Sequence, residues 1–283
     1  MLPESCPRLR SVHFVDPEDG FGVAGGDLLR DDSGVALPVR GGELVLTTDG
    51  GKRWRRVLSA PANVTDACFT NTTDGWAATP EHVWKTVDGG RHWSASFTEP
   101  PHIQPDIGGA LGRPGDTPEV QCAQPDSAWA QFLGYDSGMS KTSFVAFATQ
   151  DGVHWHAVLE GPNELPDMPS VHTAPSPGSY PGPFSLVNST TAAFAGQDPA
   201  VGYGAAPLAI VQDGGTSVSE RGPVAGITAA DGMAFVTAGK GWVVGTNMTG
   251  SDRYDSLIEA TANGGRTWTQ QYKMWASTSL ATR

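Results

Sequence analysis

Short strand-like stretches, each with an apolar anchor, recur along the chain and alternate with clusters of Asp, Gly, Asn and Pro. In the first part of the chain they cover 11–15, 20–24, 43–48 and 54–58. Apolar stretches of about four to eight residues bounded by such turn residues are typical of β-strands. The pattern therefore predicts an all-β protein.

The strand-like stretches belong to a longer repeat. In each copy an apolar anchor is followed seven residues later by an aromatic residue, and later by an Asp-Gly-Gly-type turn that usually closes on Trp. Repeats of about 50 to 65 residues built from short strands are typical of a β-propeller with one four-stranded sheet per repeat. The anchors are Phe14, Phe69, Cys122, Val187 and Phe235, and their aromatic partners are Phe21, Trp76, Trp129, Phe194 and Trp242.

Five copies predict five blades, whose four strands are called A to D in chain order. A sixth blade would have to be built from unrecognised pieces, and ring closure would draw on 1–10 or 272–283 as a completing strand. The copies tile the chain without an obvious second domain, so we expect residues 1–283 to form a single propeller domain. The repeat units cover about 11–58, 65–98, 118–159, 183–222 and 231–274.

The Asp-Gly-Gly turns join strands C and D. An Asp carboxylate accepts backbone N–H groups across its own turn, Gly supplies a positive φ, and the closing Trp covers the hairpin. A catalytic acid is needed once, whereas a turn is needed in every blade, so fivefold recurrence indicates a structural function. These predicted turn residues are Asp49, Trp54, Asp88, Trp93, Asp151, Trp155, Asp213, Asn263 and Trp268.

The turn at 48–54, which reads TDGGKRW, and its copies resemble the Asp-box, or BNR, repeat. Together with the anchor and aromatic positions, the pattern is most similar to repeats of the photosystem II stability/assembly factor family. The resemblance covers about 11–274, although unit three lacks the second Gly and unit four has Val218 in place of Trp. It implies a propeller that recognises a partner protein, and an exported one, because relatives of this repeat type are often exported.

Alternating strand direction places the A–B and C–D turns on one face of a propeller, here called the turn-bearing face. The B–C loops and D-to-A links share the other, here called the loop-bearing face. All long insertions fall on the loop-bearing face: 26–42, 94–118, 135–142, 156–183, 197–206 and 246–255. Because Tyr and Arg are favoured at recognition surfaces, these insertions predict a binding face. Its candidate residues are Arg30, Asp31, Arg40, Arg113, Tyr135, Tyr203, Arg253 and Tyr254.

Asp boxes also occur in sialidases and other glycosidases, which makes a carbohydrate-active propeller the alternative function. The Phe/Tyr-Arg-Ile-Pro motif of sialidases is absent, which disfavours that activity. Asp pairs such as Asp31 with Asp32, or Asp252 with Asp255, leave another glycosidase open. We predict a non-catalytic binding module in preference, with no catalytic residue assigned.

Other motifs carry little chemistry. A GxGxxG match at 20–25 lies on a predicted strand rather than before a helix, and His154 with His156 lacks a third metal ligand. HExxH, CxxC and GxSxG motifs are absent. We therefore expect no cofactor and no metal.

The net charge of −12 disfavours nucleic-acid binding, which needs a basic stripe. No run of apolar residues is long enough to cross a membrane, and the chain starts without a signal-peptide pattern. We expect an extracytoplasmic protein whose partner is another protein or a cell-envelope glycan. Cys68 and Cys122 fall on neighbouring first strands, so the sequence leaves open a disulfide or two buried thiols, with Cys6 unpaired.

Overall fold

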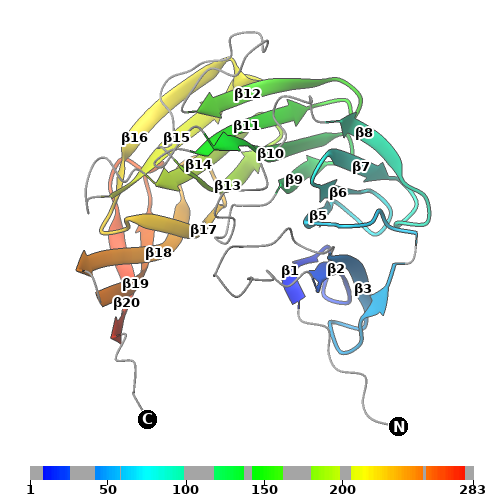
Figure 1. Cartoon of the computed structure of the whole chain (residues 1–283), viewed down its shortest axis with the longest axis horizontal. Coiled ribbons are helices and arrows are strands. Elements are labelled where there is room, and N and C mark those ends of the chain that lie inside the picture. The colour runs from blue at the N-terminus through cyan, green and yellow to red at the C-terminus, as the bar shows by residue number, and fades with distance from the viewer. Residues whose placement is uncertain are drawn as a thin grey trace. The chain divides into compact units, whose positions relative to one another are not determined.

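The computed structural model describes residues 9–25, 42–57, 59–98, 118–136, 142–161, 180–197, 205–250 and 253–277. Each of its five sheets has four antiparallel strands in sequence order, and the five sheets are the blades of a β-propeller (Figure 1). The predicted fold class is therefore confirmed.

The strands follow the predicted order A to D in every blade. Blade one contains β1 (Leu9–Phe14), β2 (Asp19–Ala24), β3 (Glu43–Thr48) and β4 (Arg55–Arg56); blade two contains β5 (Asp66–Phe69), β6 (Gly75–Thr79), β7 (His82–Thr86) and β8 (Ser94–Thr98). Blade three contains β9 (Glu119–Gln124), β10 (Ser127–Asp136), β11 (Thr142–Thr149) and β12 (Trp155–Gly161). Blade four contains β13 (Tyr180–Asn188), β14 (Thr191–Gln197), β15 (Ala205–Gln212) and β16 (Ser217–Ala225), with a 3-10 turn at Asp213–Gly215; blade five contains β17 (Ala229–Phe235), β18 (Gly241–Gly250), β19 (Arg253–Thr261) and β20 (Thr269–Ser277).

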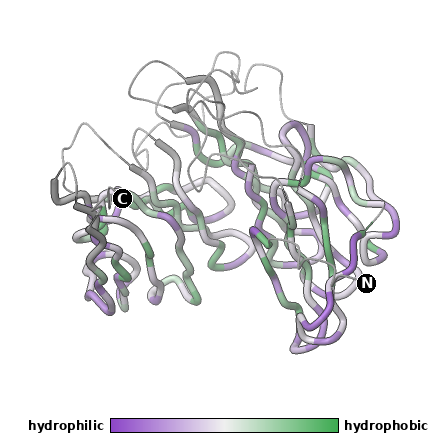
Figure 2. Tube along the Cα trace, turned by 60° about the horizontal axis from the view of Figure 1, so that its bottom comes forward, coloured by the Kyte–Doolittle hydropathy of each residue, from purple (hydrophilic) through white to green (hydrophobic). Residues whose placement is uncertain are grey.

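The tertiary contacts fall into two units. The first comprises residues 1–112, 117–132 and 146–156, and the second comprises 113–116, 133–145 and 157–283. Hydrophobic residues concentrate along the strands and hydrophilic residues at the turns (Figure 2).

In the first unit, the anchor and aromatic positions of successive repeats meet. Phe21 of β2 and Phe69 of β5 are both buried, and their rings stack with centroids 3.4 Å apart. Trp93, which closes the second turn, packs edge-on against Phe69 at 6.2 Å. The repeat therefore records packing between blades as well as strand formation within a blade.

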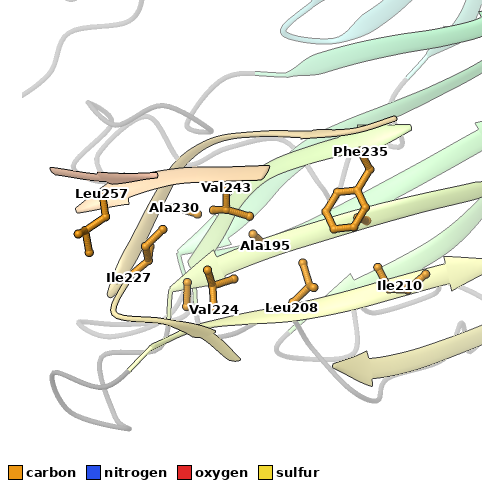
Figure 3. Packing of buried hydrophobic residues seen from close by; sticks show 11 residues of the cluster. Ala195, Leu208, Ile210, Val224, Ile227, Ala230, Phe235, Val243 and Leu257 are labelled. Atoms are coloured by element: carbon orange, nitrogen blue, oxygen red, sulfur yellow. The ribbon is translucent and has the colours of Figure 1, made fainter. Parts of the chain in front are cut away.

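In the second unit, blades four and five share a core of branched aliphatic side chains. Leu208 of β15 and Val224 of β16 face Val243 of β18 and Leu257 of β19, with Ile227 of the connecting segment between them (Figure 3). Burying a side chain of this size stabilises a fold by roughly 1.5–3 kcal/mol. This packing holds the last two blades together.

Two expectations about local structure are wrong. The segment 246–255 was expected to be a loop, but β18 reaches Gly250 and β19 begins at Arg253, with Met248 paired to Tyr254. Tyr135 likewise belongs to β10. Backbone pairing extends these strands beyond the repeat core, because each added residue satisfies its N–H and C=O groups in the ladder.

Candidate functional site

The Asp-box turns are built on a threonine two residues before each Asp. In blade two, the Thr86 hydroxyl donates to Asp88 Oδ1 at 3.0 Å and accepts the N–H of Gly90 at 2.9 Å. Asp88 Oδ1 then accepts the N–H of His92 at 2.9 Å. Gly89 and Gly90 take the positive φ that this turn needs, 71° and 81°.

The same network recurs in three other blades. The hydroxyls of Thr47, Thr149 and Thr261 donate to Asp49, Asp151 and Asn263 at 2.9, 3.2 and 3.1 Å. Blade four has Val211 at the threonine position, and there Asp213 itself takes a positive φ of 52° in a 3-10 turn. Loss of one buried hydroxyl thus coincides with a different turn.

The turn carboxylates have lowered pKa values. Hydrogen bonds from the His92 side chain and backbone lower the pKa of Asp88 to about 2, and His154 lowers the pKa of Asp151 in the same way. For Asp49, the main cause is the hydrogen bond from the Arg53 backbone. These exposed acids are ionised acceptors within their own turns.

The closing tryptophans also bind their surroundings. The indole N–H groups of Trp54 and Trp93 each donate to the carbonyl of the second turn Gly at 3.1 Å, and that of Trp155 donates to Ser96 Oγ at 3.0 Å. Trp268 packs against the core of the second unit. Every Asp-box residue named from the sequence therefore lies in or beside a turn.

A different pair of carboxyl groups lies at the opposite ends of the strands. Asp66 begins β5 and Glu119 begins β9, immediately after D-to-A links, and β1 contributes Ser11 beside Asp66. Asp66 and Glu119, with Ser11, are called the first-strand carboxyl site. Because the links into β5 and β9 belong to the loop-bearing face, so does this site.

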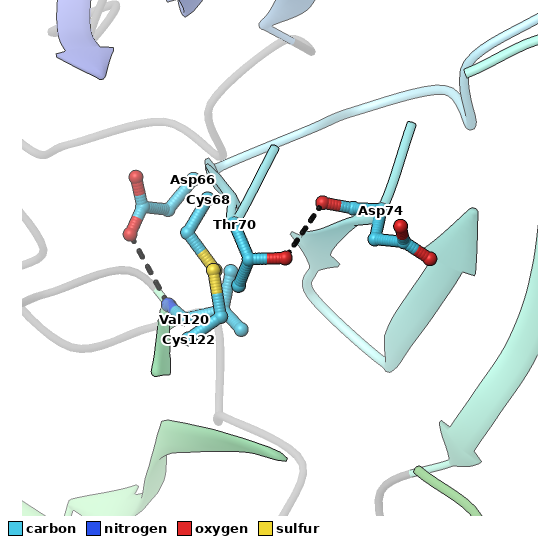
Figure 4. The surroundings of a disulfide bond; sticks show 6 residues. All are labelled: Asp66, Cys68, Thr70, Asp74, Val120 and Cys122. Carbon is cyan, nitrogen blue, oxygen red and sulfur yellow. Dashed lines mark hydrogen bonds between the residues drawn. A yellow bond between two sulfur atoms is a disulfide. The ribbon is translucent and has the colours of Figure 1, made fainter. Parts of the chain in front are cut away.

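The two strands that carry the site are fastened to each other (Figure 4). Cys68 and Cys122 form a disulfide with their Cα atoms 5.9 Å apart, which resolves the alternatives that the sequence left open. The Val120 N–H donates to Asp66 Oδ2 at 3.1 Å, and the Thr65 hydroxyl donates to the Pro118 carbonyl at 2.7 Å. These bonds hold the starts of β5 and β9 in a defined arrangement.

Both carboxyl groups have raised pKa values. Burial raises the pKa of Asp66 to about 6, against the opposing effect of hydrogen bonds from Val120 and Ser11. Burial, with a further contribution from the Asp66 charge, raises the pKa of Glu119 to about 8. Neighbouring carboxyl groups with separated pKa values are the arrangement that acid–base catalysis requires.

Sequence reasoning missed this site, although a signal was present. In blades one to three the residue three before the anchor is Ser11, Asp66 or Glu119, and each pairs with the equivalent position of the second strand: Val23, Ala78 and Gln131. A polar or acidic residue at the same place in three successive repeats would have pointed to one end of the first strands. Attention to the insertions and turns left these strand-initial positions aside.

The predicted binding residues are only partly placed. Arg30, Asp31, Arg40, Arg113 and Tyr203 lie outside the described residues, as do Asp32 and Asp252 of the proposed Asp pairs. Tyr135, Arg253 and Tyr254 have described backbones within β10 and β19. These eight residues stay a prediction.

Within the described ranges, no group of three or more His, Cys, Asp and Glu side chains is arranged to hold a metal ion. Among those same ranges, no helix has the length and hydropathy needed to cross a membrane.

No protein-family model matches the sequence, and no curated protein matches it. Among solved structures, the GH74 enzyme of Niastella koreensis superposes with a TM-score of 0.51 at 10% identity, over 90% of this chain and 49% of that one. The chain thus spans about half the length of that enzyme. At this identity the likeness shows the propeller fold alone.

Two further structures are similar at lower scores. TolB from Acinetobacter baumannii has a TM-score of 0.49 at 8% identity, over 95% of this chain and 55% of that one. An α-L-arabinofuranosidase from Fusarium graminearum has a TM-score of 0.44 at 12% identity, over 93% and 80%.

Proposed function

We propose that the protein acts on a carbohydrate at its loop-bearing face, as a glycoside hydrolase whose two carboxyl groups are Asp66 and Glu119. The observation that supports this proposal is the pair itself: two adjoining carboxyl groups on fastened strands, with pKa values of about 6 and about 8. This reverses the preference drawn from the sequence, which assigned no catalytic residue. Glycoside hydrolysis commonly uses two carboxyl groups in this way.

The pKa values assign the two residues different tasks. Between pH 6 and 8, Asp66 is mainly ionised and Glu119 mainly protonated. Glu119 donates its proton to the glycosidic oxygen as the bond from that oxygen to the anomeric carbon breaks. Water adds to the anomeric carbon and gives its proton to Asp66, so both carboxyl groups end with exchanged charges and the proton count balances.

The position of the pair suits a site whose specificity lies in the surrounding connections. Asp66 and Glu119 stand at strand starts, whereas the long connections around them vary from blade to blade in sequence and length. A rigid strand holding the reacting groups, with loops around it, is a common arrangement of binding and catalytic sites. The substrate contacts are therefore expected from the B–C loops and D-to-A links.

The test is hydrolysis of a panel of oligosaccharides by the native protein and by Glu119→Gln and Asp66→Asn. We expect reducing ends to be released by the native protein and by neither variant. Asp88→Asn is the matched control, because it neutralises an acid of the turn-bearing face, and it should retain activity. If no oligosaccharide is cleaved, or if the Glu119 variant cleaves normally, the hydrolase proposal is wrong.

A second candidate is a non-catalytic recognition module, as the sequence favours. The observation behind it is that the Asp66 carboxylate already accepts hydrogen bonds from Val120 and Ser11, which gives it a structural task. In this case the resemblance to Asp-box and assembly-factor repeats points to a partner protein or a cell-envelope glycan. The contacts would come from Arg30, Asp31, Arg40, Arg113, Tyr135, Tyr203, Arg253 and Tyr254.

The recognition module makes its own prediction. Replacing Arg253 and Tyr254 together by Ala should abolish partner capture from the native envelope without changing the thermal midpoint, while Glu119→Gln should have no effect on capture. Capture that survives the double replacement in a folded protein would remove these two residues from the binding surface.

Under either function we propose an extracytoplasmic location. The Cys68–Cys122 disulfide supports it, because such bonds persist in oxidising compartments and are rare in the cytosol.

A further inference from the structure

We infer that a second ligand site lies on the turn-bearing side of blades one and two, where a cleft lined by arginines takes an acidic oligosaccharide. The cleft has a volume of about 770 Å³ and is lined by residues of the last strand of blade one and the turns of blade two. Its polar lining includes Arg55, Arg56, Arg91, Ser59, Thr72 and Thr73.

The two walls of the cleft are joined. The Ser59 hydroxyl donates to the carbonyl of Gly90, and Val57 lies against that glycine. Gly89 N–H donates to the Thr73 carbonyl at 2.8 Å, which joins the two turns of blade two. The cleft is therefore formed by bonded segments whose spacing is set by the packing of the two blades.

Its charge is unusual for this chain. The protein carries a net charge of −12, yet three guanidinium groups line one cleft. Arg56 pairs with Glu43 at 2.5 Å. Arg55 and Arg91 are exposed, and within the described part of the chain neither has a carboxylate partner. The Asp88 carboxylate at the rim is already bound by Thr86 and His92. Two guanidinium groups thus stay available to an incoming anion.

The remaining lining indicates what carries that anion. Planar guanidinium groups bind carboxylate and sulfate oxygens through paired hydrogen bonds. Threonine hydroxyls on the same wall both donate and accept, as sugar hydroxyls require. Phe21, Val57 and the exposed Val87 add apolar surface against which a sugar ring can pack. A ligand with anionic groups, many hydroxyls and apolar ring faces is a uronate-bearing oligosaccharide.

This site is separate from the first-strand carboxyl site. Asp66 begins β5, whereas Thr72 and Thr73 follow its last residue, Phe69, at the opposite end of the strand. The inference therefore goes beyond the proposed hydrolysis and does not depend on it. It gives the protein a place to hold an acidic glycan while the opposite face stays open.

The experiment is a calorimetric titration of the intact protein with hexagalacturonate. We expect binding that weakens as NaCl is raised, and that falls at least about 10-fold in Arg55→Gln/Arg91→Gln. Arg266→Gln is the matched control: Arg266 holds the place in the blade-five turn that Arg91 holds in blade two, and it lies outside the cleft lining. It should bind as the native protein does.

Two further probes separate the ligand classes. Methyl-esterified hexagalacturonate keeps the sugar rings and removes the charge, so it should not bind. Polyglutamate keeps the charge and removes the sugar, so it should bind at least about 10-fold more weakly than hexagalacturonate. Equal binding of polyglutamate, no binding of hexagalacturonate, or equal losses in the double variant and Arg266→Gln would each overturn the inference. Glu119→Gln should leave this binding unchanged, which keeps its outcome distinct from that of the hydrolase test.

Discussion

Two sets of carboxyl groups stand at opposite ends of the same strands, and their pKa values are shifted in opposite directions. On the turn-bearing face, Asp88 and Asp151 are exposed, accept several hydrogen bonds and have lowered pKa values. At the first-strand carboxyl site, burial dominates and raises the pKa values of Asp66 and Glu119.

The difference shows that the residue type alone does not assign a function. Hydrogen bonds to an ionised carboxylate favour its charged form, whereas loss of water around it favours its neutral form. The turn acids are recurrent and conspicuous in the sequence, but they stabilise hairpins. The strand-initial acids are inconspicuous, yet they have the pKa values that proton transfer near neutral pH requires.

The largest expected effect is on the pH dependence of hydrolysis. With Asp66 as base and Glu119 as acid, activity should follow a bell between limbs near pH 6 and pH 8. Each limb should fall about 10-fold per pH unit outside this range. The measurement is kcat/KM across pH on whichever oligosaccharide the panel selects. Limbs far from both values would separate the activity from this pair.

The second effect is on stability at the seam that carries the site. Replacing Cys68 and Cys122 by Ser removes the disulfide between β5 and β9 and should lower the free energy of unfolding by about 2–5 kcal/mol. The measurement is denaturant unfolding with and without reductant. Cys6→Ser is the control and should unfold as the native protein does. If reductant destabilises the double variant as much as the native protein, the bridge is not the cause.

A smaller effect is expected in the turns. Thr86 is 2% exposed and its hydroxyl binds both Asp88 and Gly90. Thr86→Val removes these bonds at nearly constant volume and should lower the free energy of unfolding by about 1–2 kcal/mol. Thr269→Val, at an exposed position of β20, should change it little. Equal effects at the two positions would contradict the importance of the buried hydroxyl.

The smallest effect contrasts the two sets of acids directly through the pH dependence of stability. Because the pKa of Glu119 is raised from 4.5 to about 8, its stabilising contribution is complete below pH 4.5 and is lost as pH rises through about 8. The pKa of Asp88 is lowered from 3.8 to about 2, so its contribution is present above 3.8 and is lost as pH falls through about 2.

Glu119→Gln should therefore flatten the stability profile on the neutral and alkaline side, and Asp88→Asn should flatten it on the acid side. Thermal midpoints measured from pH 2 to 9 test both. A profile that either variant leaves unchanged in its own range would remove that carboxyl group from the comparison.

Much of the fold was predictable because its signals are local. The Asp49 turn carries its own acceptor and its own glycines, and the anchor Phe69 lies seven residues before Trp76 in each repeat register. Local signals failed where pairing partners decide the outcome. Tyr254 was expected in a loop, but its strand continues because Met248 is opposite to it.

The candidate site was not predictable in the same way. Asp66 and Glu119 are separated by a whole repeat, and their interaction depends on β5 lying beside β9. The sequence contained their shared register position but not the burial that shifts their pKa values. The arginine-lined cleft is a similar case, since Arg55 and Arg91 come from different blades.

By itself, the sequence determined the strand order, the number of blades and the chemistry of the turns, because each of these depends on residues close together along the chain. Only the tertiary structure decided that Cys68 pairs with Cys122, that two strand-initial carboxyl groups share one desolvated place, and that arginines of two blades line one cleft. The physical reason is that burial and charge interaction depend on distances between blades, which no local pattern encodes.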